Sequence, residues 1–302
     1  MRATNNNKEC RRKAWNSVAI ATSVAVVLWA APVSVLGADL KPETLQQWDE
    51  YVKDVDGRNQ KHFAPAASFV SSAQNPDKSA KLRAGQIIVW PASHQVPLKV
   101  DSGLIHDWIG AAFISDTTLR ETLAVLRDYD RYKQFYHPSV VQSKLIASFD
   151  SKDEFSMVLT NNSVIAKTAL DSDYQTTYRQ VDGHSCYSIS DTTRIQEIAD
   201  YDTPWEHMLP ENHGTGLIWR LHSVTRFEER DGGVYVQLEA IALSRDIPAG
   251  LRWIIDPIVR RVSRSSLATS LRQTQSAVRL YSASAMTPFN KSSAPAIMPS
   301  FR

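Results

Sequence analysis

The chain has 302 residues, of which 43% are hydrophobic and 22% charged, so it can fold around a sizeable core. Residues 1–38 hold five basic residues and one acidic residue, so the formal charge of +2 becomes −2 without them. With no basic stripe left and only Cys186 as a remaining cysteine, the sequence excludes a disulfide-held fold and makes nucleic-acid binding a poor hypothesis.

Residues 1–38 have the pattern of a secretory signal peptide. Basic residues around Arg11 precede an apolar run over 18–36, and the small residues Gly37 and Ala38 follow it. The alternative is an uncleaved membrane anchor, because the run approaches the ~20 residues needed to span a bilayer. Pro32 and the small residues favour cleavage, so we expect an exported protein, periplasmic or extracellular.

Residues 39–101 are predicted to form an N-terminal helical and extended segment. Apolar residues at three- and four-residue steps, such as Trp48 and Val55, predict a helix over 39–60. The residues from 61 to 82 have the composition of a loose connection, and short strands are expected over 85–90 and 96–100.

The main domain is expected over 102–281. It begins with a strand over 103–114, and Thr118 and Glu121 have the spacing of a capping box at the start of a helix. From 139 to 245, short runs rich in β-branched residues and tyrosine alternate with tight polar turns, which predicts about six antiparallel strands. A longer loop interrupts them over 200–215.

The domain is predicted to end in a long helix. After a short turn or helix over 248–255, Asp256 is expected as the N-cap, Pro257 as the first helical residue and a stripe including Leu267 and Leu271 as the buried face. Residues 282–302 are predicted to be a disordered tail. The predicted fold class is α+β, with a curved antiparallel sheet and this long C-terminal helix packed across it.

Two segments resemble the START-like superfamily, which includes polyketide cyclases and lipid-transfer domains. They are "TLRETLAVLRDYDRYKQFYHPSVVQSKL" at 118–145 and "SRDIPAGLRWIIDPIVRRVSRSSLATSL" at 244–271. The stretches "GLIHDWIGAAF" and "GLIWRLHSVTRFEERDGGVYVQLEAIALSRDIP" are similar to uncharacterised exported bacterial members. The resemblance implies the helix-grip fold and a site for an apolar molecule between the sheet and the last helix.

The hairpin over 216–245 carries two contrasting sets of side chains. If Asp231 and Gly232 form a two-residue turn, one face holds the apolar residues Trp219, Leu221, Phe227, Val234, Val236, Leu238, Ala240 and Ala242. The other face then holds Arg220, His222, Arg226, Tyr235, Gln237, Glu239 and Ile241. The charged set either lies outside, in solvent or against the N-terminal segment, or points inward and anchors a ligand head group.

Further candidate residues lie elsewhere in the chain. Tyr129, with Tyr132 and Tyr136, is expected either in the core or at a ligand entrance, and Arg245 either at the mouth of the site or in a surface ion pair. His207 and His213 lack the helical spacing of a zinc motif, so no metal and no cofactor are expected.

These observations predict an exported binding protein for a hydrophobic small molecule or lipid, with transient membrane contact as a further possibility. The predicted ligand-binding residues are Trp219, Arg220, His222, Leu238, Glu239, Tyr129 and Arg245. One alternative is a cyclase- or dehydratase-like enzyme in which Glu239 and His222 act as general acid and base. Another is an envelope protein that docks through residues 39–100.

Overall fold

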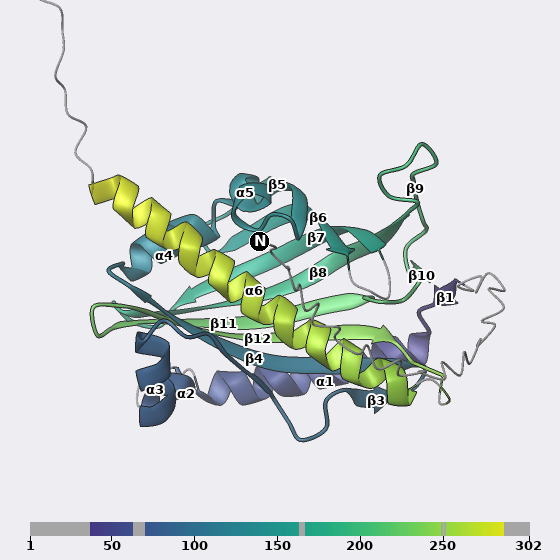
Figure 1. The fold of residues 1–302 in the computed structure, drawn as a ribbon, viewed down its shortest axis with the longest axis horizontal. Coiled ribbons are helices and arrows are strands. Elements are labelled where there is room, and N and C mark those ends of the chain that lie inside the picture. Colours follow the sequence, from purple (N-terminus) through teal and green to yellow (C-terminus); the bar gives the residue numbers. More distant parts are fainter. Residues whose placement is uncertain (1–36, 63–69, 163–166, 249, 251, 287–302) are drawn as a thin grey trace, which may run out of the picture. The chain divides into compact units, whose positions relative to one another are not determined.

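The computed structural model describes residues 37–62, 70–162, 167–248, 250 and 252–286 (Figure 1). The chain from Gly37 onward forms one compact unit. The predicted signal segment before Gly37 and the tail beyond Met286 lie outside the described residues.

An antiparallel sheet dominates this unit. Its main path runs in the order β2-β4-β12-β11-β8-β7-β6-β5, while β3 also pairs with β4 and β9 pairs with β8. The strands are β2 (Ile88–Pro91), β3 (Leu98–Val100), β4 (Gly103–Ser115), β5 (Val140–Ser148), β6 (Lys152–Asn162), β7 (Lys167–Gln180), β8 (Ser185–Ala199), β9 (His207–Met208), β11 (Arg220–Arg230) and β12 (Gly233–Arg245). Two short strands, β1 (Ala38–Asp39) and β10 (His213–Gly214), pair separately. The predicted antiparallel meander is therefore confirmed.

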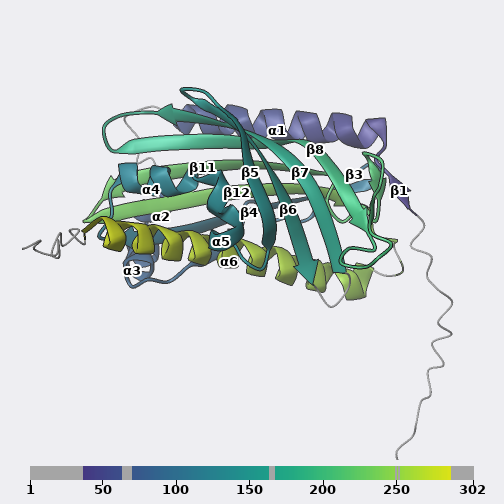
Figure 2. The same cartoon turned by 90° about the horizontal axis from the view of Figure 1, so that it is seen from above.

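Helices cover both sides of the sheet, with α1 and α6 on opposite sides (Figure 2). The helical elements are α1 (Pro42–His62), α2 (Ser71–Gln74), α3 (Pro76–Arg83), α4 (Leu119–Leu126), η1 (Tyr129–Arg131), α5 (Tyr132–Phe135) and α6 (Arg252–Met286). The predicted capping box is present at α4, where Thr118 and Glu121 satisfy each other's backbone N–H groups. No helix among the described residues is long and apolar enough to cross a membrane.

The side of the sheet that α6 covers is called the α6 face. A Cβ atom added to Gly110 in β4 would lie 2.6 Å from Leu271 and 3.0 Å from Leu267, so the missing side chain lets α6 approach the strand closely. Phe227, Val234 and their neighbours join these leucines in one apolar cluster. The apolar set of the hairpin thus faces α6, apart from Trp219, which lies on the other side.

The opposite side, the α1 face, is covered by the N-terminal segment. Trp48 and Val55 of α1 pack against Ile241 and Leu243, while Leu82 of α3 packs against Tyr235. Because β2 and β3 also belong to the main sheet, the boundary expected at residue 101 is no break in the fold. The charged set of the hairpin meets the N-terminal segment, which is one of the two arrangements that the sequence left open.

Three local expectations were wrong. The connection over 61–82 contains α2 and α3, because the Asn75 side chain caps the N–H of Lys78 and Pro76 is pre-set for the first helical turn. Asp256 and Pro257 lie inside a continuous α6 rather than at its start. The helix also runs past Ser282, which is buried and hydrogen-bonds to Thr117 at 3.0 Å.

The layers explain the element pattern of the sequence. A sheet with an apolar face requires a cover, and the long final helix supplies it, whereas the charged face is covered by polar residues of α1. The predicted α+β architecture, an antiparallel sheet with a long C-terminal helix packed across it, is confirmed (Figures 1 and 2).

Candidate ligand site on the α6 face

Small side chains form the middle of the α6 face. The register aligns Ala240 of β12 with Ser223 of β11, then with Ser190 of β8 and Thr176 of β7. Ala242 and Thr225 lie on the same side because residues two apart along a strand share a face. These positions leave room above the centre of the sheet that large side chains would fill.

Exposure differs between the two faces of β12 and β11. On the α1 face, Tyr235, Gln237, Glu239, Ile241 and Leu243 are all buried. On the α6 face, Leu238, Ala240, Ala242, Ser223 and Thr225 are all partly exposed. Small and apolar side chains that stay partly exposed in central strands make the α6 face a candidate binding surface.

Larger side chains bound this open floor on both sides. On one side, Trp108 of β4 packs with Leu267 and Leu271 of α6. On the other, the rings of Tyr129 and Phe155 stack with centroids 4.1 Å apart, and those of Phe155 and Tyr174 with centroids 5.0 Å apart. The floor therefore lies between the roof helix and an aromatic cluster.

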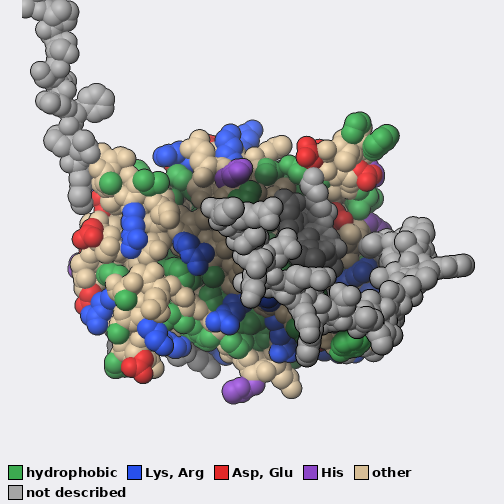
Figure 3. Space-filling model, viewed as in Figure 1, with side chains coloured by type: hydrophobic (Ala, Val, Ile, Leu, Met, Phe, Trp, Pro, Cys, Tyr) green, Lys and Arg blue, Asp and Glu red, His purple; other side chains and the backbone are tan. Residues whose placement is uncertain are grey.

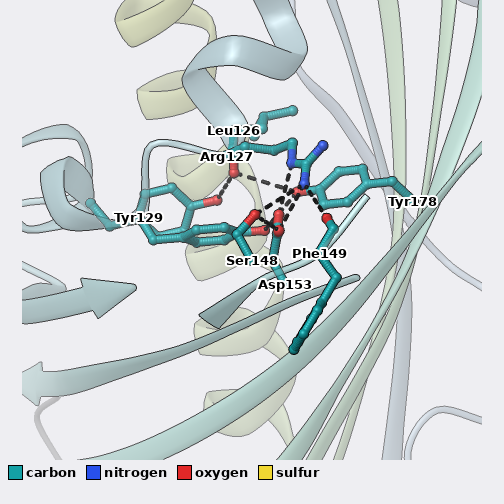
Figure 4. A network of polar contacts seen from close by, with 8 residues as sticks. Leu126, Arg127, Tyr129, Ser148, Phe149, Asp153 and Tyr178 are labelled. Carbon is teal, nitrogen blue, oxygen red and sulfur yellow. Dashed lines mark hydrogen bonds and ion pairs between the residues drawn. The ribbon is translucent and has the colours of Figure 1, made fainter. Parts of the chain in front are cut away.

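A buried carboxylate holds the aromatic side in place (Figure 4). Asp153 accepts two hydrogen bonds of 2.8 Å from Arg127, one of 2.6 Å from Ser148 and one of 3.1 Å from Tyr129. The Tyr129 and Tyr178 hydroxyls lie 3.0 Å apart. Although burial opposes ionisation, the bonds from Arg127 and Ser148 hold the pKa of Asp153 below its usual value. This network ties α4 and η1 to β5, β6 and β7.

Four buried polar atoms on the α6 face have no hydrogen-bond partner among the described residues. They are the Trp108 Nε1, the His106 Nδ1, the Ser172 Oγ and the Tyr174 Oη. All four residues are at least nine-tenths buried, and an unsatisfied buried polar atom costs about 1–3 kcal/mol. His106 and Trp108 in β4 are two residues apart, as are Ser172 and Tyr174 in β7, and both pairs point to the α6 face. The unpartnered atoms therefore lie on both sides of the small residues at its centre.

His106 is held as a neutral base on this face. Its Nε2 lies 3.0 Å from the Ser244 hydroxyl. Burial, and then the positive charge of Arg260 on α6, lowers the pKa of His106 to about 4. The ring therefore presents a free nitrogen beneath the first half of α6.

The α1 face holds a different polar network, one that binds α1 to the sheet. Asn59 donates a 3.1 Å hydrogen bond to Glu239 and accepts one from Arg226. The His222 Nδ1 lies 2.7 Å from Asp191, and its Nε2 lies 3.3 Å from Asp56. Glu239 and His222 therefore cannot act as an acid–base pair on a molecule held under α6.

The structure does not bring the predicted site residues together. Leu238 lies on the α6 face, whereas Arg220, His222 and Glu239 lie on the α1 face. Trp219 is also on the α1 face, packed with Trp48 and Ile241, because the alternation of β11 begins only at Arg220. Tyr129 is 2% exposed and belongs to the Asp153 network. Arg245 donates its backbone N–H to Gly216, at the edge of the sheet.

A groove of about 620 Å³ lies between α1 and the central strands β8 and β11. Arg220 lines it, together with Trp48, Asp49, Val52, Lys53, Asp56, Gly57, Gln60, Asp191 and Thr192. Its acidic and basic side chains are mixed. Among the described residues, no group of three His, Cys, Asp or Glu side chains is placed to hold a metal ion.

Sequence reasoning missed most of the α6 face outside the hairpin. Ser190 lies in β8, which pairs with the later strand β11, while a register shift between Asp173 and Tyr174 interrupts the pairing of β7 with β8 beside Ser172. No local pattern therefore assigned these residues to a face. The signal that was present is the alternation of small and hydroxyl residues in β8, "SCYSISDTT". Combined with the pairing of β8 and β11, this alternation would have placed Ser188 and Ser190 among the small residues of the α6 face.

Comparisons with known proteins bear on the fold. No protein-family model and no curated protein matches the chain. Among solved structures, the chain is similar to a STAR-related lipid transfer protein from Xanthomonas axonopodis, with 17% identity and a TM-score of 0.41 over 61% of this chain and 98% of that chain. It is also similar to the Zhui aromatase/cyclase of a Streptomyces species, with 8% identity and a TM-score of 0.38 over 58% and 94% of the two chains.

A START superfamily protein from Mycobacterium smegmatis is similar at 8% identity and a TM-score of 0.36, over 58% of this chain and 97% of that chain. These likenesses concern the fold alone. The function has to be inferred from the geometry of this chain's own α6 face.

Proposed function

We propose that the protein is an exported binding protein for a hydrophobic small molecule or lipid, which it holds between the α6 face and α6. One observation carries the proposal. The small side chains at the centre of the α6 face, such as Ala240 and Ser223, stay partly exposed, although they lie in central strands between a packed helix and an aromatic cluster.

The chemistry of this face suits a mostly apolar ligand. Leu238, Ala240 and Ala242 offer apolar surface, which stabilises a bound molecule by about 25 cal/mol per Å² before the costs of association. The unpartnered atoms of Trp108, Ser172 and Tyr174 offer a few polar contacts at its margins. A site of this kind is typically apolar, with a small number of polar groups that fix the orientation of the ligand.

Export is the second part of the proposal. It is supported by the basic and apolar pattern of residues 1–38, which precede the described chain. N-terminal sequencing of the mature protein should place its first residue close to Asp39. A mature chain that still begins at Met1 in the cytoplasmic fraction would contradict this part alone.

The binding function is tested by uptake of an apolar fluorophore and by native mass spectrometry of the freshly purified protein. We expect the probe to bind, and a Ser223→Phe variant to lose at least about tenfold in affinity because the ring occupies the floor. Ser276→Phe is the matched control, since Ser276 is exposed on α6.

Equal binding by Ser223→Phe and wild type would place the ligand elsewhere on the protein. A folded wild-type protein that takes up no apolar probe and carries no co-purified molecule would overturn the binding function itself.

A further inference from the structure

The helix that covers the α6 face is strongly basic. From Pro257 to Met286 it contains no acidic residue. Its arginines in this stretch are all exposed: Arg260, Arg261, Arg264, Arg272 and Arg279. Basic side chains follow the line of α6 across the surface (Figure 3).

Two of these arginines lie on the sheet-facing side of the helix. Arg260 lies seven residues before Leu267, and Arg264 lies three residues before Leu267 and seven before Leu271, spacings that share one side of an α-helix. The two leucines contact β4 at Gly110. Both arginines are exposed, but they continue the sheet-facing side of α6 by about two turns toward its N-terminus.

The strand beneath them supplies an unmet polar group. Arg260 is close enough to His106 for its charge to lower the pKa of that ring. His106 is 5% exposed, and its Nδ1 has no hydrogen-bond partner among the described residues. Trp108, two residues along the same face, offers an unpartnered indole N–H that can only donate.

Asp256, four residues before Arg260, is the one acidic residue of α6 against six arginines, so the helix keeps a net positive charge. Within the described part of the chain, neither Arg260 nor Arg264 has an ion-pair partner. Two arginines thus lie on the side of α6 that faces β4, the strand in which His106 and the Trp108 indole N–H have unpartnered atoms. This donor set, next to apolar surface, is complementary to an anionic group attached to an apolar body.

We infer that the ligand is an anionic amphiphile, whose carboxylate or phosphate head group is bound by Arg260 and Arg264 beside His106 and Trp108, while its apolar part lies over Ala240 and Ala242. This inference rests on the proposed binding function and narrows it to a chemical class. A neutral lipid would leave both guanidinium groups without a partner and would gain nothing from their position.

The test compares an anionic probe with its neutral counterpart. Dansylated undecanoic acid and its methyl ester share chain and fluorophore and differ in charge, so the ratio of their affinities isolates the head group. We expect the acid to bind at least about tenfold more tightly than the ester, because charge-assisted hydrogen bonds are the stronger kind.

Variants locate the effect on the helix. The double variant Arg260→Gln/Arg264→Gln should remove the preference for the acid and leave the affinity for the ester unchanged. Arg272→Gln with Arg279→Gln removes the same charge from the solvent side of α6 and should keep the preference. Equal loss in both double variants would mean a long-range effect of net charge and would overturn the inference.

The remaining outcomes separate the two proposals. If wild type binds acid and ester equally well, the anionic class is wrong while the binding function stands; if it binds neither, both fail. Displacement of the probe by lysophosphatidic acid but not by a long-chain fatty acid assigns a phosphate head group, and the reverse assigns a carboxylate. Displacement by inorganic phosphate alone would show a simple anion site and contradict the amphiphile.

Discussion

At the scale of single residues, Asp153 shows how the chain holds a charge inside the fold. Its side chain is fully buried, yet it accepts hydrogen bonds from Arg127, Ser148 and Tyr129, which join α4 and η1 to the β5–β6 hairpin. Removing one member of a buried ion pair leaves the other unpaired, and this costs more than the pair itself contributes.

Asp153→Ala should therefore destabilise the protein by about 3 kcal/mol, measured as the free energy of unfolding in urea. The exposed Asp150 in the adjacent turn gives the matched control, and Asp150→Ala should change that free energy by less than about 0.5 kcal/mol. Similar losses in both variants would mean that the network has no special role.

At the scale of elements, the contact of α6 with β4 depends on a missing side chain. Gly110 lies directly under Leu267 and Leu271, and a Cβ atom there would come within 2.6 Å of Leu271. Gly57 in α1 is the opposite case, because a Cβ atom added to it would meet nothing within 4 Å. Replacing glycine by alanine should therefore have opposite effects on stability at these two positions.

Gly110→Ala should lower the free energy of unfolding by about 1–3 kcal/mol, because overpacking shifts α6. Gly57→Ala should raise it by up to about 1 kcal/mol, because glycine is a poor helix former. Thermal unfolding of the two variants checks both signs. A neutral Gly110→Ala variant would show that α6 does not press on β4.

At the scale of the whole unit, the two faces of the sheet differ in how their central side chains are covered. The α1 face buries ionisable groups that bind α1, and the α6 face stays partly open. Although burial alone lowers it, the contacts with Asp191 and Asp56 raise the pKa of His222 to about 9. Burial and the nearby Glu239 raise the pKa of Asp107, which also faces α1, to about 7.

Both pKa values in the folded state lie above the ordinary values of 6.5 for a histidine such as His222 and 3.8 for an aspartate such as Asp107, so the folded state binds more protons. The contribution of His222 to the free energy of unfolding is fully present below about pH 6.5 and is lost as the pH rises through about 9. The contribution of Asp107 to the same free energy is lost at lower pH, as the pH rises through about 7. Rising pH should therefore weaken the attachment of α1, where Tyr51, Arg58 and Glu239 are the other charged or titratable neighbours.

The free energy of unfolding of wild type should fall by up to about 3 kcal/mol between pH 6.5 and 9 on account of His222. His222→Gln should lack this part of the pH dependence, whereas His184→Gln, at an exposed histidine, should keep it. Urea unfolding at a series of pH values measures the difference. Identical profiles for wild type and His222→Gln would contradict the role of the two carboxylates.

Much of the fold could be predicted because its signals are local. The capping box at Thr118, the Asp231–Gly232 turn and the apolar stripe at Leu267 and Leu271 each act within a few residues. The register Arg230↔Gly233 shows that the turn has two residues, the condition on which the predicted faces of the hairpin depended. The site was predicted less well. Leu238 was assigned to the side that faces α6, but the charged residues chosen beside it point away from that helix.

The sequence by itself determined the order of the elements, the alternation of apolar and charged side chains in the β11–β12 hairpin and the long final helix, because periodicity depends on near neighbours. Only the tertiary structure decided which face each helix covers. That choice depends on contacts such as Asn59 with Glu239 and Leu271 with Gly110, which join residues more than 150 positions apart. It placed the buried charges of the β11–β12 hairpin against α1 and left small residues partly exposed beneath α6, because unpaired charges are costly to bury and α1 could pair them.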